Sequence, residues 1–140
     1  MAAKTISLNF QGYWTEPEIS KIPKQSGVFV VYEYTKNRQE ASVFLKKVIY
    51  IGESENVNER IAKHKKWPFW KKLCGSNQIC FSFARVSNAD RKRSEAALIY
   101  KHKPPANDGY IVSFPFDETT MNLNGKVALL TRGFTVNRRV

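Results

Sequence analysis

Short apolar runs that are rich in β-branched and aromatic residues, or that alternate with polar residues, predict several strands. GVFVVYEY at 27–34 is rich in β-branched and aromatic residues, and KVIYIG follows at 47–52. Such runs are typical of strands. We expect these two to pair as an antiparallel hairpin, with the long polar connection between them projecting at its tip. TISLNF at 5–10 and QICFSFARV at 78–86 predict two more strands.

A helix is predicted just after the second strand of this hairpin. Asn56 is a good N-cap, and Glu59 stands three residues later, as in a capping box. We expect the helix to run through VNERIAKHKK and to end by Pro68, because proline breaks a helix interior. Arg60 and His64 are four residues apart and would therefore share one helix face.

The rest of the chain adds a second helix and a strand-rich tail. ADRKRSEAALIYKHK at 89–103 predicts a helix that is capped by Asn88 and ends before the two prolines at 104–105. WTEPEISKIPKQSG at 14–27 predicts a loop with a short helical turn. GYIVSFPF, KVALLTRG and FTVNRRV predict short strands after residue 108. The order of elements favours an α+β domain with a largely antiparallel sheet.

Composition narrows the class of protein. A chain of 140 residues with 42% apolar residues fits a single domain over 1–140 with its own core. No apolar run is long enough to span a membrane, and no secretory signal is visible. Cys74 and Cys80 fit no common zinc spacing, so we expect reduced thiols in a cytoplasmic protein.

The positive charge is concentrated in one part of the chain. The net charge is +11, and residues 56–103 hold 12 Lys and Arg against 3 Asp and Glu. A basic segment interleaved with Trp67, Phe69 and Trp70 favours nucleic acid as the partner. A solvated surface that only aids solubility is the alternative, and membrane-surface binding is a lesser one. The predicted nucleic-acid-binding residues are Lys63, Lys65, Lys66, Lys71, Lys72, Arg91, Lys92 and Arg93.

A set of spaced residues resembles a known family. GVF at 27–29 and YIG at 50–52 are followed by Arg60, eight residues after the glycine of the second motif, and by His64 four residues later. Glu95 lies in the second predicted helix, and Asn107 follows it by twelve residues, behind a proline-containing segment. Over about residues 26–107 the chain resembles the GIY-YIG nuclease family.

The resemblance implies a fold, an activity and a site. The fold would be a small three-stranded antiparallel sheet flanked by helices, with extra short strands in a C-terminal extension at about 108–140. The activity would be divalent-metal-dependent cleavage of DNA phosphodiester bonds. Tyr50, Arg60, His64 and Glu95 would be catalytic, and Gly27, Phe29, Gly52 and Asn107 would support them.

The resemblance assigns chemistry to each candidate. Tyr50 would act on the attacking water, with its pKa lowered by a nearby cation. Arg60 would bind the phosphate through its planar guanidinium, and His64 would donate to the phosphate or shuttle a proton. Glu95 would hold one Mg²⁺ or Mn²⁺ ion weakly, since a single carboxylate supplies the protein's share of its shell. Gly52 would let the chain turn sharply after Tyr50.

Two positions depart from the family pattern and keep a second hypothesis open. Phe29 stands where the first motif usually ends in tyrosine, and Glu53 stands where a lysine is common. Both favour a nucleic-acid-binding module on the same scaffold whose catalysis is impaired. DNA is the expected partner, RNA is an alternative, and a dimer would suit cleavage of both strands.

Overall fold

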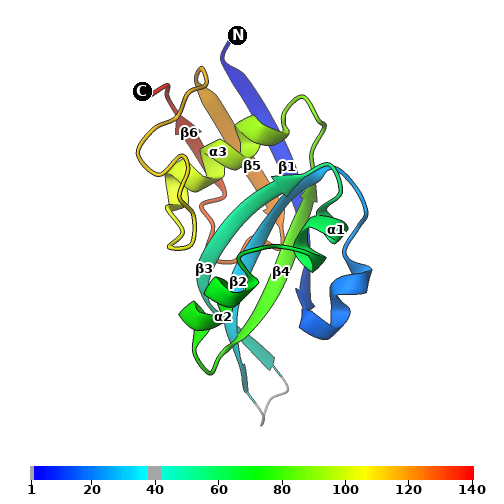
Figure 1. The fold of residues 1–140 in the computed structure, drawn as a ribbon. Helices are drawn as coiled ribbons and strands as arrows, with labels where there is room; N and C mark the ends of the chain where they lie inside the picture. Colours follow the sequence, from blue (N-terminus) through cyan, green and yellow to red (C-terminus); the bar gives the residue numbers. More distant parts are fainter. Residues whose placement is uncertain (1, 38–41) are drawn as a thin grey trace.

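One curled, mixed β-sheet organises the molecule (Figure 1). The computed structural model describes residues 2–37 and 42–140. Its sheet has six strands in the order β3-β2-β4-β1-β5-β6. The strands are β1 (Lys4–Thr15), β2 (Gly27–Asn37), β3 (Ser42–Ser54), β4 (Gln78–Arg85), β5 (Thr119–Gly125) and β6 (Gly133–Val136).

The expected small three-stranded sheet flanked by helices is wrong. Strands β2, β3 and β4 do pair antiparallel, but β4 also pairs with β1. Strand β1 in turn pairs in parallel with β5, and β5 pairs with β6. The alternating residues Ile6, Leu8 and Phe10 of β1 are buried, so this strand belongs to the core although it lies outside the region of the resemblance at 26–107.

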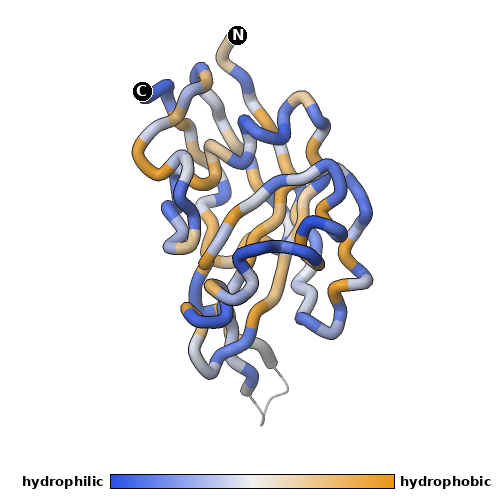
Figure 2. Tube along the Cα trace, viewed as in Figure 1, coloured by the Kyte–Doolittle hydropathy of each residue, from blue (hydrophilic) through white to orange (hydrophobic). Residues whose placement is uncertain are grey.

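Both faces of the sheet are covered, which gives the molecule two apolar cores. One core joins β1, β2 and β5 to helix α3 (Arg91–His102), with Leu98 and Met121 among its members. The other core joins β2, β3 and β4 to α1 (Val57–Ala62) and α2 (Trp67–Cys74), around Phe29 and Trp70. In Figure 2 the hydrophilic segment that carries α1 and leads to α2 lies outside the largely apolar strands.

The β2–β3 hairpin is confirmed, but its strands are longer than predicted. Strand β2 continues to Asn37 and β3 begins at Ser42, so the polar residues flanking 38–41 join the ladder. The long connection expected between the two strands is therefore wrong. The connection is short, because the pairing of β2 with β3 continues through the polar residues at their ends. The predicted projecting tip lies outside the described residues.

The first predicted helix is two helices. Asn56 caps α1 as predicted, and its side chain accepts a hydrogen bond from the Glu59 N–H at 3.1 Å. Helix α1 ends at Ala62, and α2 begins at Trp67 with Pro68 in its first turn. Proline is well accommodated there, because first-turn N–H groups have no partner within the helix. His64 consequently lies after α1 and does not share a helix face with Arg60.

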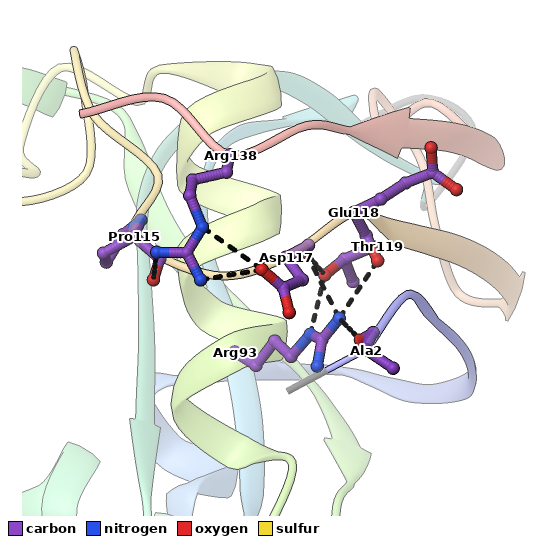
Figure 3. Close-up of polar contacts among 7 residues, drawn as sticks. All are labelled: Ala2, Arg93, Pro115, Asp117, Glu118, Thr119 and Arg138. Carbon is purple, nitrogen blue, oxygen red and sulfur yellow. Dashed lines mark hydrogen bonds and ion pairs between the residues drawn. The ribbon is translucent and has the colours of Figure 1, made fainter.

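Helix α3 is confirmed in its main part but begins at Arg91, with Asp90 rather than Asn88 at its N-cap. Arg93 is 7% exposed, and its guanidinium donates to the carbonyl oxygens of Ala2, Asp117 and Glu118 and to the Thr119 hydroxyl (Figure 3). Arg93 thus ties α3 to the starts of β1 and β5. It does not belong to an exposed basic surface, contrary to the prediction.

The loop at 14–27 contains a 3₁₀ helix, η1 (Glu16–Lys21), which confirms the short helical turn. The C-terminal predictions are only partly right. Strand β6 lies within the predicted region, but GYIVSFPF and KVALLTRG form no strands beyond an isolated bridge at Phe114. Strand β5 is formed instead by TTMNLNG, whose polar residues gave no strand signal.

Cys74 and Cys80 are free thiols, and both are buried. Burial raises the pKa of Cys74 to about 11 and that of Cys80 to about 12.

Within residues 2–37 and 42–140, every helix is too short or too polar to cross a bilayer.

Candidate active site

A pocket of about 200 Å³ lies at the free edge of β3. Tyr50 of β3 and Glu95 of α3 both line it, although 45 positions separate them in the chain. Lys66 enters from the segment between α1 and α2, and Asp108 and Tyr110 enter from the loop after α3. The fold therefore brings a phenol, a carboxylate and an ammonium to one small hollow.

The loop after α3 is fastened along the β3 edge. The Ala106 N–H donates to the Ile49 carbonyl at 2.9 Å. The Asn107 side chain accepts from the Ile51 N–H at 2.9 Å and donates to the Ile51 carbonyl at 2.8 Å. Asn107 therefore imitates a neighbouring strand and positions the pocket wall next to Tyr50.

The motif glycines are required by close packing. A Cβ atom at Gly52 would lie 2.4 Å from Cζ of Phe29, and one at Gly27 would lie 2.2 Å from the Ala84 carbonyl oxygen. Gly52 lies inside β3 rather than at a turn, so its predicted role in a sharp turn is wrong. The Phe29 ring is fully buried over Gly52, with its centroid 6.1 Å from that of Tyr50.

Tyr50 keeps its proton in this environment. Its pKa is raised above the ordinary value of 10.0, first by burial and then by the negative charge of Glu95, while Arg60 acts in the opposite direction. The expectation that a nearby cation lowers its pKa does not fit this balance. Tyr50 is thus a neutral hydroxyl that can donate or accept a hydrogen bond.

Glu95 is a half-buried carboxyl group with no hydrogen bond or ion pair to any other residue that the structure describes. Burial and the neighbouring Glu53 raise its pKa to about 7, and Arg60 and Lys92 partly offset that rise. Glu53 itself is paired with Arg91, with Oε1 and Nε 2.5 Å apart. The negative charge of Glu95 is therefore poorly compensated, as is usual for a group that receives a cation.

Arg60 lies on the exposed side of α1 and lines a separate pocket of about 350 Å³ together with Glu59 and Lys63. Its charge influences the pKa values of Tyr50, His64 and Glu95, so its guanidinium is within electrostatic range of all three. Among the described residues, Arg60 has no ion-pair partner. It is available for an anionic ligand.

His64 is a buried, neutral member of an aromatic cluster. Its Nδ1 accepts from the Lys66 N–H at 3.1 Å, which leaves the proton on Nε2, and Nε2 has no hydrogen-bond partner within the described chain. Its ring centroid lies 5.1 Å from that of Tyr50 and 4.6 Å from that of Trp70. Burial and the charges of Arg60, Lys66 and Lys65 lower its pKa to about 4.

The predicted basic residues differ in how free they are. Lys65, Lys72 and Lys92 are exposed, without an ion-pair partner in the part of the chain that the structure describes. Lys71 pairs with Glu16, Lys63 lies 3.7 Å from Glu59, and Lys66 pairs with Asp108 at 2.9 Å. Arg91 pairs with Glu53, and Arg93 is internal.

Asp108 and Tyr110 are pocket residues that the sequence analysis missed. They follow Asn107 at once, so their position beside a motif residue was the only available signal. Tyr110 adopts a positive φ of 62°. Its pKa is raised by burial and by Glu95 and Glu53, which places a second neutral phenol near the same carboxylate.

Glu95 is the pocket residue that could hold a metal ion. In the described ranges, no group of three or more His, Cys, Asp or Glu side chains could hold a metal ion. Glu95, an uncompensated carboxylate beside the hydroxyls of Tyr50 and Tyr110, nevertheless supplies the hard oxygen donor that Mg²⁺ or Mn²⁺ prefers.

Comparisons with known proteins found no match to this chain among protein-family models, curated proteins or solved structures.

Proposed function

We propose that the protein is a metal-dependent endonuclease that hydrolyses DNA phosphodiester bonds. The observation that supports this most is that Tyr50 and Glu95, distant in sequence, line one pocket within electrostatic range of Arg60. These are the residues on which the resemblance to the GIY-YIG nucleases depends.

The proposal gives a role to each predicted catalytic residue, whether it lines the pocket of Tyr50 and Glu95 or lies near it. Arg60 binds the phosphate oxygens and stabilises the charge that develops during attack. Tyr50 hydrogen-bonds the attacking water and orients it toward phosphorus. His64 does not touch the substrate. It supports the Tyr50 ring from within the aromatic cluster.

Glu95 is the residue that would hold the ion. A bound Mg²⁺ or Mn²⁺ supplies Lewis-acid stabilisation of charge on the phosphate and the leaving oxygen. Glu95 binds a cation in its ionised form, so its pKa of about 7 makes metal affinity rise with pH across neutrality.

A nucleic-acid-binding module with impaired catalysis is the second candidate. Two observations favour it. Phe29 lacks the hydroxyl of the usual motif and is fully buried, and the pKa of Tyr50 is raised rather than lowered. In this alternative the pocket binds a phosphate without cleaving the strand.

The cellular setting is also a proposal. Two free, buried thiols fit a reducing compartment, and we propose a cytoplasmic location. DNA is the proposed partner, because the exposed cations near the pocket are suited to phosphates.

A plasmid-nicking assay with Mg²⁺ or Mn²⁺ tests the function. We expect the wild type to nick supercoiled DNA, and Arg60→Ala and Glu95→Ala to lose at least about 100-fold in rate. Glu95→Ala should keep its DNA affinity, since it removes a negative charge. Lys126→Ala is the control that should cleave normally, because it removes an exposed lysine after β5 whose ammonium has no hydrogen bond or ion pair with the described residues. Binding without cleavage in either metal would support the module instead.

A further inference from the structure

Phe69 is an exposed aromatic ring next to the candidate active site. It lies in the first turn of α2 and is 43% exposed. The opposite side of α2 buries Trp70 and Cys74 in the core, so Phe69 faces outward from a firmly packed helix. The fold thus holds this ring in water on a rigid support.

Lys66 connects Phe69 to the pocket. Its ammonium lies 5.8 Å from the centroid of the Phe69 ring and 5.9 Å from the centroid of the Tyr50 ring. The same ammonium also binds the Ala106 carbonyl and the Asp108 carboxylate, each at 2.9 Å. Phe69 and the pocket are therefore separated by one anchored lysine.

The surroundings of Phe69 indicate what kind of ligand would cover it. Lys65 precedes it, and Lys72 follows one helical turn later, and both are exposed without an acidic partner in the described residues. An apolar protein surface would bring no counter-charge to these lysines. A nucleic-acid strand would bring phosphates to the lysines and the flat face of a base to the ring.

We propose that Phe69 is a stacking platform for an unpaired base, so that the substrate is single-stranded or locally unpaired DNA. A base inside a duplex is stacked on both sides and offers no free face, whereas an unpaired base can stack on an aromatic ring. This inference rests on the proposed function and specifies its substrate class. A strand whose phosphate occupies the pocket continues over Lys66 and places a nearby base on Phe69.

The test compares the binding of a labelled single strand with that of the same strand annealed to its complement, by fluorescence anisotropy at fixed salt. Phe69→Ala and Phe69→Leu should weaken binding of the single strand by about 5- to 150-fold, the range that corresponds to loss of one base-stacking contact. Binding of the duplex should change less than about twofold. Phe69→Trp should keep the affinity for the single strand.

Two matched controls belong to this experiment. Leu73→Ala removes another exposed apolar side chain, 37% exposed, one turn further along α2. Phe44→Ala removes an exposed phenylalanine of β3, 60% exposed, outside the pocket lining. Both should bind each DNA like the wild type. Melting temperatures should be unchanged for Phe69→Leu, which keeps the apolar bulk.

The outcomes separate this inference from the proposed function. If the wild type binds neither DNA, the proposed function fails. If it binds both and Phe69→Leu changes neither affinity, or weakens both equally, the platform is refuted while the proposed function stands. Selective loss of single-strand binding, absent from Leu73→Ala and Phe44→Ala, supports the platform.

Discussion

At the scale of single residues, the site depends on groups whose environments change their chemistry. Glu95 is only half-buried, yet burial and Glu53 raise the pKa of its carboxyl group to about 7. His64 keeps a neutral ring, because burial and nearby cations lower its pKa to about 4. Glu95 in the pocket and His64 in the aromatic cluster are therefore mostly uncharged between about pH 4 and pH 7, whereas Lys66 and Asp108 in the pocket form an ion pair.

Replacing Glu95 should alter stability in a pH-dependent way. In the folded protein the pKa of the Glu95 carboxyl group lies above the ordinary value of 4.5. As pH rises, the carboxyl group therefore loses its proton in the unfolded chain before it does so in the folded protein. Wild-type stability therefore falls between about pH 4.5 and pH 7, and Glu95→Gln escapes that loss. We expect the variant to be more stable by about 2 kcal/mol at pH 8, allowing for solvent screening.

Urea unfolding of both proteins at pH 4 and pH 8 measures this effect. The difference in unfolding free energy between the wild type and Glu95→Gln should nearly vanish at pH 4, because the side chain at position 95 is then uncharged in both proteins. An equal difference at the two pH values would show that the Glu95 carboxyl group titrates normally.

Gly52 should tolerate no side chain. Gly52→Ala places a Cβ atom 2.4 Å from the Phe29 ring, which is fixed in the core. Overpacking of this kind costs about 1–3 kcal/mol, measurable by urea unfolding. Gly109→Ala is the control, because its Cβ atom meets nothing within 4 Å. A wild-type midpoint for Gly52→Ala would mean that Phe29 can move aside.

At the scale of elements, local patterns predicted what local forces determine. β-Branched and aromatic residues identified β2 and β3, alternation identified β4 and part of β1, and Asn56 correctly marked the start of α1. The expectation that Pro68 ends a helix is wrong, because proline is favoured in the first turn of a helix and Pro68 lies in the first turn of α2. Strand β5 was not predicted, because its pairing with β1 rather than its own composition makes it a strand.

The basic residues at the start of α3 also show what a local pattern cannot predict. The run at 91–93 suggests one charged surface, yet the Arg93 side chain is buried. It donates hydrogen bonds to Ala2, Asp117, Glu118 and Thr119. Only the tertiary structure shows which member of the run turns inward. The sequence predicted Tyr50 and Glu95 as partners through a motif, but it gave no hint of how Tyr110 reaches them.

Arg93→Met and Lys92→Met should therefore behave oppositely. Arg93→Met removes the guanidinium donors that join α3 to Ala2, Asp117, Glu118 and Thr119, and we expect a loss of about 3 kcal/mol in unfolding free energy. Lys92→Met should change stability by less than about 0.5 kcal/mol but should weaken DNA binding. Denaturation curves and anisotropy titrations of the two variants check this contrast. Equal stability of both variants would remove Arg93 from its structural role.

At the scale of the whole molecule, the sheet brings distant segments to one edge and leaves cations around it. Strands β1 and β5 pair in parallel although more than 100 residues separate them in the sequence, so no local pattern predicts this pairing. Arg60, Lys65, Lys72 and Lys92 are exposed and free of ion pairs among the described residues. The charges of Arg60 and Lys92 act on Glu95, and that of Lys65 acts on His64, so these three cations lie within electrostatic range of the site. Lys72 lies one helical turn beyond Phe69.

DNA affinity should consequently depend strongly on salt. About four phosphate contacts predict a slope of roughly −3 to −4 in a plot of log affinity against log salt concentration for duplex DNA. Titrations at several NaCl concentrations provide the slope, and Lys72→Met should reduce its magnitude by about one. A flat plot would contradict an electrostatic interface.

We propose that Tyr50, Arg60 and Glu95 form one metal-dependent site on a bound strand. The most direct test of this claim is a crystal structure of the protein with DNA and Mn²⁺, in which anomalous scattering locates the ion. We predict an ion at the Glu95 carboxylate, with a backbone phosphate between it, Tyr50 and Arg60. Bound DNA with no ion at Glu95, or with its backbone away from this pocket, would contradict the claim.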